Sequence, residues 1–298
     1  MQPAETIPQR ALFTLQRNEG ARVGTATVDA AVSSAIDILA DRSIAVLTGA
    51  GVSTDSGIPD YRGEGAPRRT PMSFGQFLGD DRSRRRYWAG SHLGFARFNA
   101  ARPNAGHFAL ARMELAGVAS GVITQNVDGL HTQAGSRRVV PLHGTMDRVV
   151  CLTCGQMFAR QDIAAEIDQL NPWLSRPESV TIAPDGDAEV TDIDSFVIPV
   201  CSICGGALKP DVVFFGEFVP PLRFQAAREL VDAADALLVA GSSLAVNSGI
   251  RLVDQARRRK LPIVVINRGE TKGDARATLK LDAGTSETLV ALADALIS

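Results

Sequence analysis

The chain has 298 residues, of which 45% are hydrophobic and 21% charged, and its formal net charge is −2. These values are ordinary for a globular protein and give no overall bias towards nucleic acid or an anionic membrane. No apolar stretch approaches the ~18–20 residues of a membrane span, and the N-terminus lacks the apolar core of a secretory signal. We therefore expect a cytoplasmic protein with one large domain, or a large and a small one.

Helical and strand patterns alternate through the first half of the chain. After a tail at residues 1–25, apolar residues recur at helical spacing over 27–41, and an apolar run at 44–48 predicts a buried parallel strand. Residues 63–105 are rich in Arg, Gly and Pro, so we expect short helices and loops there that cover a nucleotide. The patterns then predict a helix at 107–116, a strand at 121–124 and a short strand at 139–143.

Residues 145–211 interrupt this alternation and contain all of the cysteines. These form two C-x-x-C pairs, Cys151/Cys154 and Cys201/Cys204. The alternative reading is a redox dithiol, but that motif usually begins a helix after a strand. Here each pair precedes a glycine in turn-rich sequence, which is typical of zinc knuckles. We predict one structural zinc ion with four thiolate ligands.

Alternation returns after the cysteines. It predicts strands at 211–215, 236–240 and 263–267, and helices at 224–234, 249–259 and 286–296. Strands alternating with helices indicate an α/β fold: a Rossmann-like parallel sheet with helices on both faces, plus a small zinc-ribbon and helical domain. We assign 26–62, 106–144 and 212–298 to the Rossmann-like domain, 63–105 to a helical cofactor-loop module and 145–211 to the zinc-binding module.

The most informative segment is GAGVSTDSGIPDYR at 49–62, directly after the 44–48 strand. Glycines in this place let the backbone approach a diphosphate, and the next helix offers its first N–H groups to the anion. The spacing departs from the usual G-x-G-x-x-G turn, because the next glycine after Gly49 and Gly51 is Gly57. The segment therefore predicts a dinucleotide loop with a purpose other than hydride transfer.

Other polar strings follow the other predicted strands. They are TQNVDGLH at 124–131, LHG at 142–144, GSSL at 241–244 and INRG at 266–269. In an open α/β sheet the ligand lies beyond the carboxyl ends of the strands, so these strings should converge on one crevice. Amide and carboxylate side chains suit ribose hydroxyls and a carboxamide. A histidine amid such neutral polar groups suits proton transfer near neutral pH.

Together these strings resemble the sirtuins over roughly residues 30–285, in the family's order. The matching pieces are GAGVSTDSGIPDYR, TQNVDGLH, HG, CLTC, CSIC, KPDVVFFGE at 209–217, GSSLAV at 241–246 and INRG. The form STDSGIPDYR and the long spacing between the cysteine pairs resemble the class II branch, which is mitochondrial and also bacterial.

The resemblance implies an NAD-dependent protein-lysine deacylase, which consumes NAD and releases nicotinamide and O-acyl-ADP-ribose. The acyl oxygen would attack ribose C1′ as nicotinamide leaves, giving an alkylamidate. His143 would act as general base on the ribose hydroxyls, a contribution of typically ~10²–10⁴-fold. Asn126 is the second catalytic residue that the resemblance implies, and water would complete the hydrolysis.

The resemblance also assigns the NAD contacts residue by residue. The pyrophosphate loop would use Gly49, Ala50, Gly51, Ser53 and Gly57, and the mobile cofactor loop Asp60, Tyr61 and Arg62. The nicotinamide ribose and carboxamide would contact Gln125, Asn126 and Asp128. The adenosine half would contact Gly241, Ser242, Ser243, Asn267, Arg268 and Gly269, with Thr285 in the segment that closes over adenine.

The implied partners are acyl-lysine proteins, bound by a monomer without nucleic acid or membrane. The peptide would enter as an added strand between 213–217 and 243–246, pairing through its backbone. The substrate contacts would be Val213, Phe214, Phe215, Gly216, Glu217, Leu244 and Val246.

One departure bears on the acyl group. Sirtuins that prefer short acidic acyl groups carry Tyr-x-x-Arg beside the acyl channel, whereas this chain has Tyr87 followed by Gly90. A carboxylate-ended acyl group would lack that bidentate partner. We therefore expect acetyl or longer neutral acyl groups, lipoamide included.

Three rival functions are weighed against this one. Protein mono-ADP-ribosyltransfer would use the same pocket. An NAD-dependent dehydrogenase fits less well, because no acidic residue ends the expected second strand. A zinc-ribbon nucleic-acid binder would need a basic face, and the chain is near neutral with 5% aromatic residues. Of the other histidines, we expect His107 and His131 to be structural and His92 to lie on the surface.

Overall fold

The computed structural model describes residues 25–61, 71–174 and 193–297. Most of the predicted tail, Arg62 and residues 175–192 between the cysteine pairs lie outside the described residues. Within the described part, no helix is both long and apolar enough to span a bilayer.

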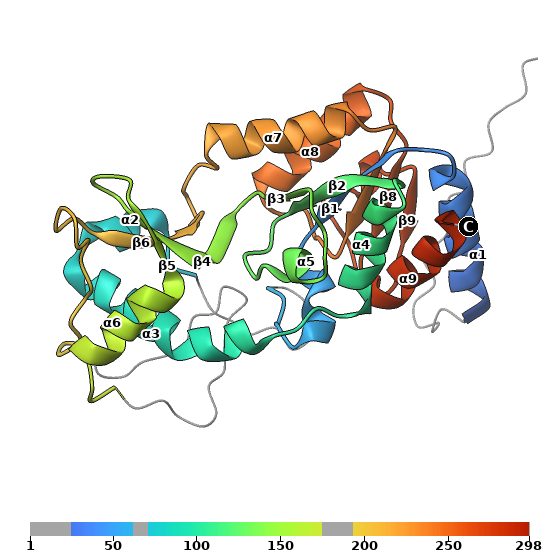
Figure 1. Cartoon of the computed structure of the whole chain (residues 1–298). Helices are drawn as coiled ribbons and strands as arrows, with labels where there is room; N and C mark the ends of the chain where they lie inside the picture. The colour runs from blue at the N-terminus through green and yellow to red at the C-terminus, as the bar shows by residue number, and fades with distance from the viewer. Residues whose placement is uncertain (1–24, 62–70, 175–192, 298) are drawn as a thin grey trace, which may run out of the picture.

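A parallel sheet of six strands forms the larger part of the molecule (Figure 1). Its strands are β1 (Ile44–Thr48), β2 (Ala119–Thr124), β3 (Val139–Pro141), β7 (Ala236–Ala240), β8 (Ile263–Ile266) and β9 (Leu279–Leu281). They lie in the order β3-β2-β1-β7-β8-β9, and each neighbouring pair is parallel. The strand order reverses between β1 and β7, which is where doubly wound sheets bind their ligands.

Helices cover both faces of this sheet. The helices α1 (Thr25–Leu39), α4 (Ala105–Leu115) and α9 (Thr285–Leu296) pack on one face, and α7 (Pro221–Asp232) and α8 (Asn247–Arg258) lie side by side on the other. Along β1, Ile44 and Val46 face the first group, and Ala45 and Leu47 face the second. Because both faces are buried, the strand is apolar at successive positions rather than alternating. The α/β fold class predicted from the sequence is confirmed.

A second, antiparallel sheet lies beside the first (Figure 1). It has the order β5-β4-β6, from β4 (Gly144–Cys151), β5 (Met157–Ala159) and β6 (Leu208–Val212). The helices α2 (Phe74–Gly79), α3 (Asp81–Ala100) and α6 (Arg160–Leu170) surround it. Trp88 of α3, Ile163 of α6 and Val149 of β4 share one apolar cluster with Phe77 of α2. We call these strands and helices the small module; the domain boundaries predicted from the sequence stay a prediction.

Two predicted elements are wrong. Residues 81–100 form one long helix, α3, rather than short helices and loops. Its periodicity is hidden because polar residues such as Ser91 and His92 are buried with the apolar ones, so His92 is not a surface residue either. The strand expected at 211–215 ends at Val212 and belongs to the small sheet, because Glu217 closes the following residues into a turn. The elements β4, β5, α6 and β9 were not predicted either.

Candidate active site

The loops after β1 and β7 touch at the point where the strand order reverses. A Cβ atom on Gly49 would lie 2.7 Å from the Gly241 carbonyl oxygen, and one on Gly51 would lie 2.9 Å from Gly241 Cα. Gly241 itself has a φ of 62°, and a Cβ there would lie 2.5 Å from Val52 N. Only glycine allows this approach. The close contact leaves a shallow crevice whose floor is main chain, which suits a diphosphate.

A hydrogen-bond network links the loops after β1 and β2. The Asn126 amide nitrogen donates to Gly49 O and to Ser53 Oγ, both at 3.1 Å. Ser53 Oγ in turn donates to Asp128 Oδ2 at 2.7 Å, and Leu130 N donates to Asp128 Oδ1 at 2.9 Å. Burial raises the pKa of the Asp128 carboxyl, against the effect of these two hydrogen bonds. The network fixes an amide and a carboxyl group at the wall of the crevice.

Two buried histidines support this network from beneath. His131 Nε2 lies 2.9 Å from Thr48 Oγ1, and His107 Nδ1 lies 3.0 Å from Asn104 Oδ1. Their rings are 4.8 Å apart, and His107 Nε2 lies 3.5 Å from Ser53 Oγ. Burial lowers the pKa of His107 to about 4 and that of His131 to about 3, so both rings are neutral at pH 7.

His143 lies between β3 and β4, with both ring nitrogens in contact with polar groups. Nδ1 lies 2.9 Å from the Gln125 carbonyl oxygen and Nε2 lies 2.8 Å from Ser248 Oγ. Because a carbonyl only accepts, the neutral ring carries its proton on Nδ1, and Nε2 accepts the Ser248 hydroxyl proton. Burial lowers the pKa of His143 while the Gln125 hydrogen bond opposes that shift. The ring is therefore a neutral base with a fixed tautomer.

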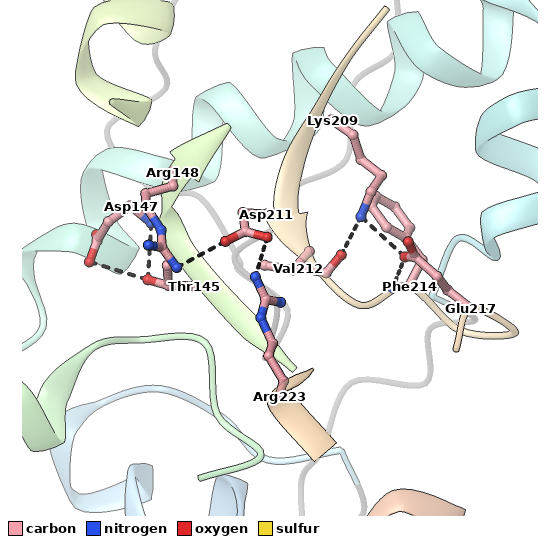
Figure 2. Close-up of polar contacts among 9 residues, drawn as sticks. All are labelled: Thr145, Asp147, Arg148, Lys209, Asp211, Val212, Phe214, Glu217 and Arg223. Carbon is pink, nitrogen blue, oxygen red and sulfur yellow. Dashed lines mark hydrogen bonds and ion pairs between the residues drawn. The ribbon is translucent and has the colours of Figure 1, made fainter. Parts of the chain in front are cut away.

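The loop from Val213 to Glu217 directly follows β6 of the small module and lines a cavity. Figure 2 shows the polar contacts of its Phe214 and Glu217. Glu217 Oε2 accepts hydrogen bonds from Phe214 N at 2.9 Å and Lys209 Nζ at 3.1 Å. Asp211, just before the loop, is paired with Arg148 of β4 at 3.0 Å and with Arg223 of α7. Since α7 packs on the large sheet, the Asp211 carboxylate links the small module to it.

Ser243, Ala245 and Val246, in the loop after β7, line the same cavity. The carbonyl of Ser243 accepts from Lys272 N at 3.0 Å, and that of Ala245 accepts from Lys272 Nζ at 2.9 Å. Leu244 has a φ of 52°, and its side chain is buried in the core beneath the sheet. Lys272 therefore fixes this segment in an irregular extended path.

One cavity of about 2100 Å³ joins these parts. It exceeds the ~300–1,000 Å³ typical of small-molecule sites, so it has room for more than a dinucleotide. The predicted residues that line it are Gly49, Ala50, Gly51, Ser53, Asp60, Tyr61, Gln125, Asn126, Asp128, His143, Val213, Phe214, Phe215, Gly216, Glu217, Gly241, Ser242, Ser243, Val246, Asn267, Arg268, Gly269 and Thr285. Gly57 and Leu244 do not line it, and Arg62 lies outside the described residues.

Sequence reasoning missed several residues of the cavity. Ser248 was missed because the hydroxyl reaches His143 from the first turn of α8, 105 positions away in the chain. Met72 and Ile58 also line the cavity and pack in the small-module cluster with Tyr87, the residue expected beside the acyl channel. Thr285, by contrast, was predicted: its hydroxyl donates to Gly51 O at 3.0 Å from the start of α9.

The four cysteines lie together at one end of the small sheet. Their sulfur atoms all lie within 4.8 Å of one another, with 3.5 Å between Cys151 and Cys204 and 3.7 Å between Cys154 and Cys201. Tetrahedral zinc with Zn–S bonds of about 2.3 Å places its sulfur ligands about 3.8 Å apart. The thiols therefore fit one zinc ion with no open coordination position.

The fold and the crevice define a dinucleotide-binding α/β protein that carries a second, cysteine-bearing module. Residues 49–248 match the Sir2 family model, and the chain belongs to the Sir2 family. It is 53% identical over 265 residues to the NAD-dependent protein deacetylase 1 of Mycobacterium avium, covering 88% of this chain and 94% of that protein. It is 47% identical over 259 residues to the mitochondrial NAD-dependent protein lipoamidase sirtuin-4 of Bos taurus, covering 85% and 82%.

A solved structure of a similar protein agrees with this. The structure described as a Sir2–p53 peptide–NAD+ complex superposes with a TM-score of 0.68 at 30% identity, covering 87% of this chain and 95% of that one.

Proposed function

We propose that this protein is an NAD-dependent protein-lysine deacylase that releases nicotinamide and O-acyl-ADP-ribose. The single observation that carries the proposal is His143: a neutral imidazole, oriented by Gln125 O and Ser248 Oγ, in one cavity with the glycine crevice and the 213–217 loop. In the proposal this cavity would bring a dinucleotide site, a peptide cleft and a base together. The deacetylase and lipoamidase relatives support the same reaction class.

We assign each segment that lines the cavity to one part of NAD or to the peptide. The loop at Gly49–Ser53 would take the pyrophosphate, and Asn126 and Asp128 would hold the nicotinamide ribose and carboxamide. The adenosine half would lie along the loops after β7 and β8, closed by Thr285 at the start of α9. The peptide would lie between 213–217 and 243–246. All of these segments line the same cavity, which supports the assignment.

Bound NAD supplies an electrophilic ribose C1′ and nicotinamide as the leaving group. His143 would take the proton of a ribose hydroxyl at Nε2, the nitrogen that carries a lone pair. Its Nδ1–H keeps donating to the Gln125 carbonyl oxygen, and this hydrogen bond stabilises the protonated ring once Nε2 has taken the proton. Asn126, held by Gly49 O and Ser53 Oγ, would orient the ribose.

Cys151, Cys154, Cys201 and Cys204 would hold a structural zinc ion. With four thiolates the ion has no position left for substrate, so its contribution is to fold the small module. Since this module carries β6 and the loop after it, the zinc site would support the peptide cleft at a distance.

For the finer points, we propose a cytoplasmic monomer that binds no nucleic acid and favours neutral acyl groups. The absence of an arginine at Gly90 supports the acyl preference. Light scattering tests the oligomeric state, and retention on DNA at low salt would contradict the expected lack of nucleic-acid binding.

The decisive experiment is a mass-spectrometric panel. The protein and NAD are incubated with one peptide that bears acetyl, butyryl, succinyl, lipoyl or myristoyl lysine, with His143→Ala alongside. We expect acyl loss with matching O-acyl-ADP-ribose, abolished in the variant. NAD consumption without acyl loss would overturn the proposal and favour ADP-ribosyl transfer, the alternative for which no separate observation speaks. Succinyl at the top of the ranking would contradict the acyl preference.

A further inference from the structure

The cavity does not end at the proposed peptide cleft but continues along α7 and α8. These two helices lie side by side (Figure 1). On α7 it is lined by Phe224, Gln225, Arg228, Glu229 and Asp232, and on α8 by Ser248, Ile250, Arg251 and Asp254. We call this extension the α7–α8 groove. Apart from Ser248, which orients His143, none of these residues has a part in the proposed binding of NAD or in the proposed proton transfer.

The groove has the dimensions of a peptide site. The α7 residues that line it recur at 224, 228 and 232, which is one face of a helix over two turns. At 1.5 Å per residue this face is about 12 Å long. An extended chain rises about 3.3 Å per residue, so the groove has room for roughly three or four residues beyond the proposed cleft.

Two cations in the groove have no acidic partner within the described residues. Neither Arg228 nor Arg251 makes an ion pair there, although both are exposed. Arg251 is nevertheless held in place, because its guanidinium lies 4.2 Å from the centre of the Phe224 ring. A guanidinium stacked on an aromatic ring keeps its edge N–H groups available for a carboxylate.

The acidic side chains of the groove, in contrast, are engaged. Asp254 pairs with Arg276, at 2.5 Å. Asp232 accepts from Gln255 at 2.6 Å and lies 3.9 Å from Arg259. Glu229 accepts from Gln225 at 2.9 Å, a neutral partner. These carboxylates would repel a polyanion such as DNA, but they leave room for a single acidic side chain.

The entrance to the groove is apolar. Phe218, directly after the 213–217 loop, is 93% exposed and lines the same cavity as Val246. Aromatic residues are enriched in protein interfaces, so Phe218 suits contact with a peptide side chain.

We propose that the α7–α8 groove is a second substrate subsite, which binds the polypeptide flanking the acyl-lysine and selects an acidic side chain there through Arg228 and Arg251. This proposal rests on the proposed function, because it needs the peptide to lie between 213–217 and 243–246. The subsite would let the protein distinguish substrates by a side chain that lies away from the modified lysine. Backbone pairing alone does not distinguish side chains.

The test uses long acyl-lysine peptides in which one residue is Glu or Gln. The substituted position is moved stepwise away from the lysine on each side, and a short peptide without flanking residues establishes basal turnover. We expect the wild-type protein to prefer Glu over Gln about two- to fivefold in kcat/KM, the range of one exposed ion pair. The preference should be confined to neighbouring positions on one side, act through KM and weaken with salt.

The variants are Arg228→Gln, Arg251→Gln and their combination, with Arg257→Gln as the matched control. Arg257 is an exposed arginine of α8, the helix that also carries Arg251, and it does not line the cavity. The Glu/Gln ratio should approach one in the double variant and stay at the wild-type value in the control. Because each ratio is taken within one variant, general damage to the protein cancels.

Equal use of Glu and Gln peptides by the wild-type protein, or an unchanged ratio in the double variant, would overturn the subsite. Fluorescence anisotropy of the labelled long peptides measures the same ratio as a binding preference, without turnover. If neither the short nor the long peptides are deacylated, the proposed function fails, and the anisotropy ratio still decides whether the groove selects an acidic side chain. Equal anisotropy for both peptides would then reject the subsite too.

Discussion

Lys209 Nζ lies 3.1 Å from Glu217 Oε2, and the same oxygen accepts the Phe214 backbone N–H at 2.9 Å (Figure 2). Only 6% of the Lys209 side chain is exposed, and its ammonium lies 5.0 Å from the centre of the Phe214 ring. Burial lowers the pKa of Lys209, although Glu217 opposes that shift. Through these contacts Glu217 links Lys209 to the backbone of the 213–217 loop and closes that loop.

Replacing Glu217 with Gln should weaken peptide binding more than NAD binding. The variant leaves a buried ammonium without its counter-charge, a loss typically of about 3–5 kcal/mol when the pair is fully buried. We expect less here because Glu217 is partly exposed. The loop should loosen, so KM for an acyl-peptide should rise several-fold while KM for NAD stays within twofold. Steady-state kinetics with each substrate varied in turn provide the measurement.

The combination Lys209→Met with Glu217→Gln is the control for that experiment. It removes both charges, so it should recover part of the stability lost by Glu217→Gln alone. Equal increases in both KM values would argue against a role confined to the peptide loop.

Ser248→Ala should change the pH dependence of the reaction as well as its rate. The Ser248 hydroxyl donates to His143 Nε2, which favours the neutral ring. Without it, the pKa of His143 should rise from its depressed value, and the acidic limb of the kcat/KM profile should move to higher pH. We also expect kcat to fall up to about tenfold as the ring loses its orientation. Rescue by Ser248→Thr would identify the hydroxyl as the cause, and an unshifted limb would reject it.

The main elements of the fold were predictable from the sequence because both faces of the large sheet are buried. The strands at 44–48 and 236–240 are continuous apolar runs, and their predicted bounds agree with β1 and β7. The elements of the small module were harder to predict from the sequence. Its helix α3 buries Ser91 and His92 beside Trp88, so the pattern of an amphipathic helix is lost.

The residues of the crevice were predictable where they directly follow a strand. Gln125 and Asn126 follow β2, and Gly241 follows β7, so chain order alone places them at one edge of the sheet. Contacts between distant segments gave no such signal. The contact between Ser248 and His143 depends on how α8 packs. The ion pair between Asp211 of the small module and Arg223 depends on how α7 packs.

Removing zinc should unfold the small module first. Each of the four cysteines supplies one corner of the sulfur cluster, so any single Cys→Ser variant should lose the ion. We expect one zinc per chain by elemental analysis of the wild-type protein. A chelator or Cys154→Ser should lower the Tm and raise KM for the peptide before it affects NAD binding. A wild-type protein with no bound zinc and an unchanged Tm in chelator would contradict the site.

Acid should destabilise the protein through His107 and His131. In the folded chain burial lowers the pKa of these residues to about 4 and about 3, whereas an unfolded histidine titrates near 6.5. Between these values the unfolded state binds more protons, so their contribution to stability is complete above about pH 6.5 and falls as pH drops towards 4. A tenfold difference in proton affinity between the folded and unfolded states corresponds to roughly 1.4 kcal/mol of stability.

We therefore expect the Tm to fall steeply between pH 6.5 and 4.5. His131→Gln removes one of the two groups, so its Tm should be lower at pH 7.5 but change less over that range. A variant curve parallel to that of the wild-type protein would show that other groups cause the acid sensitivity.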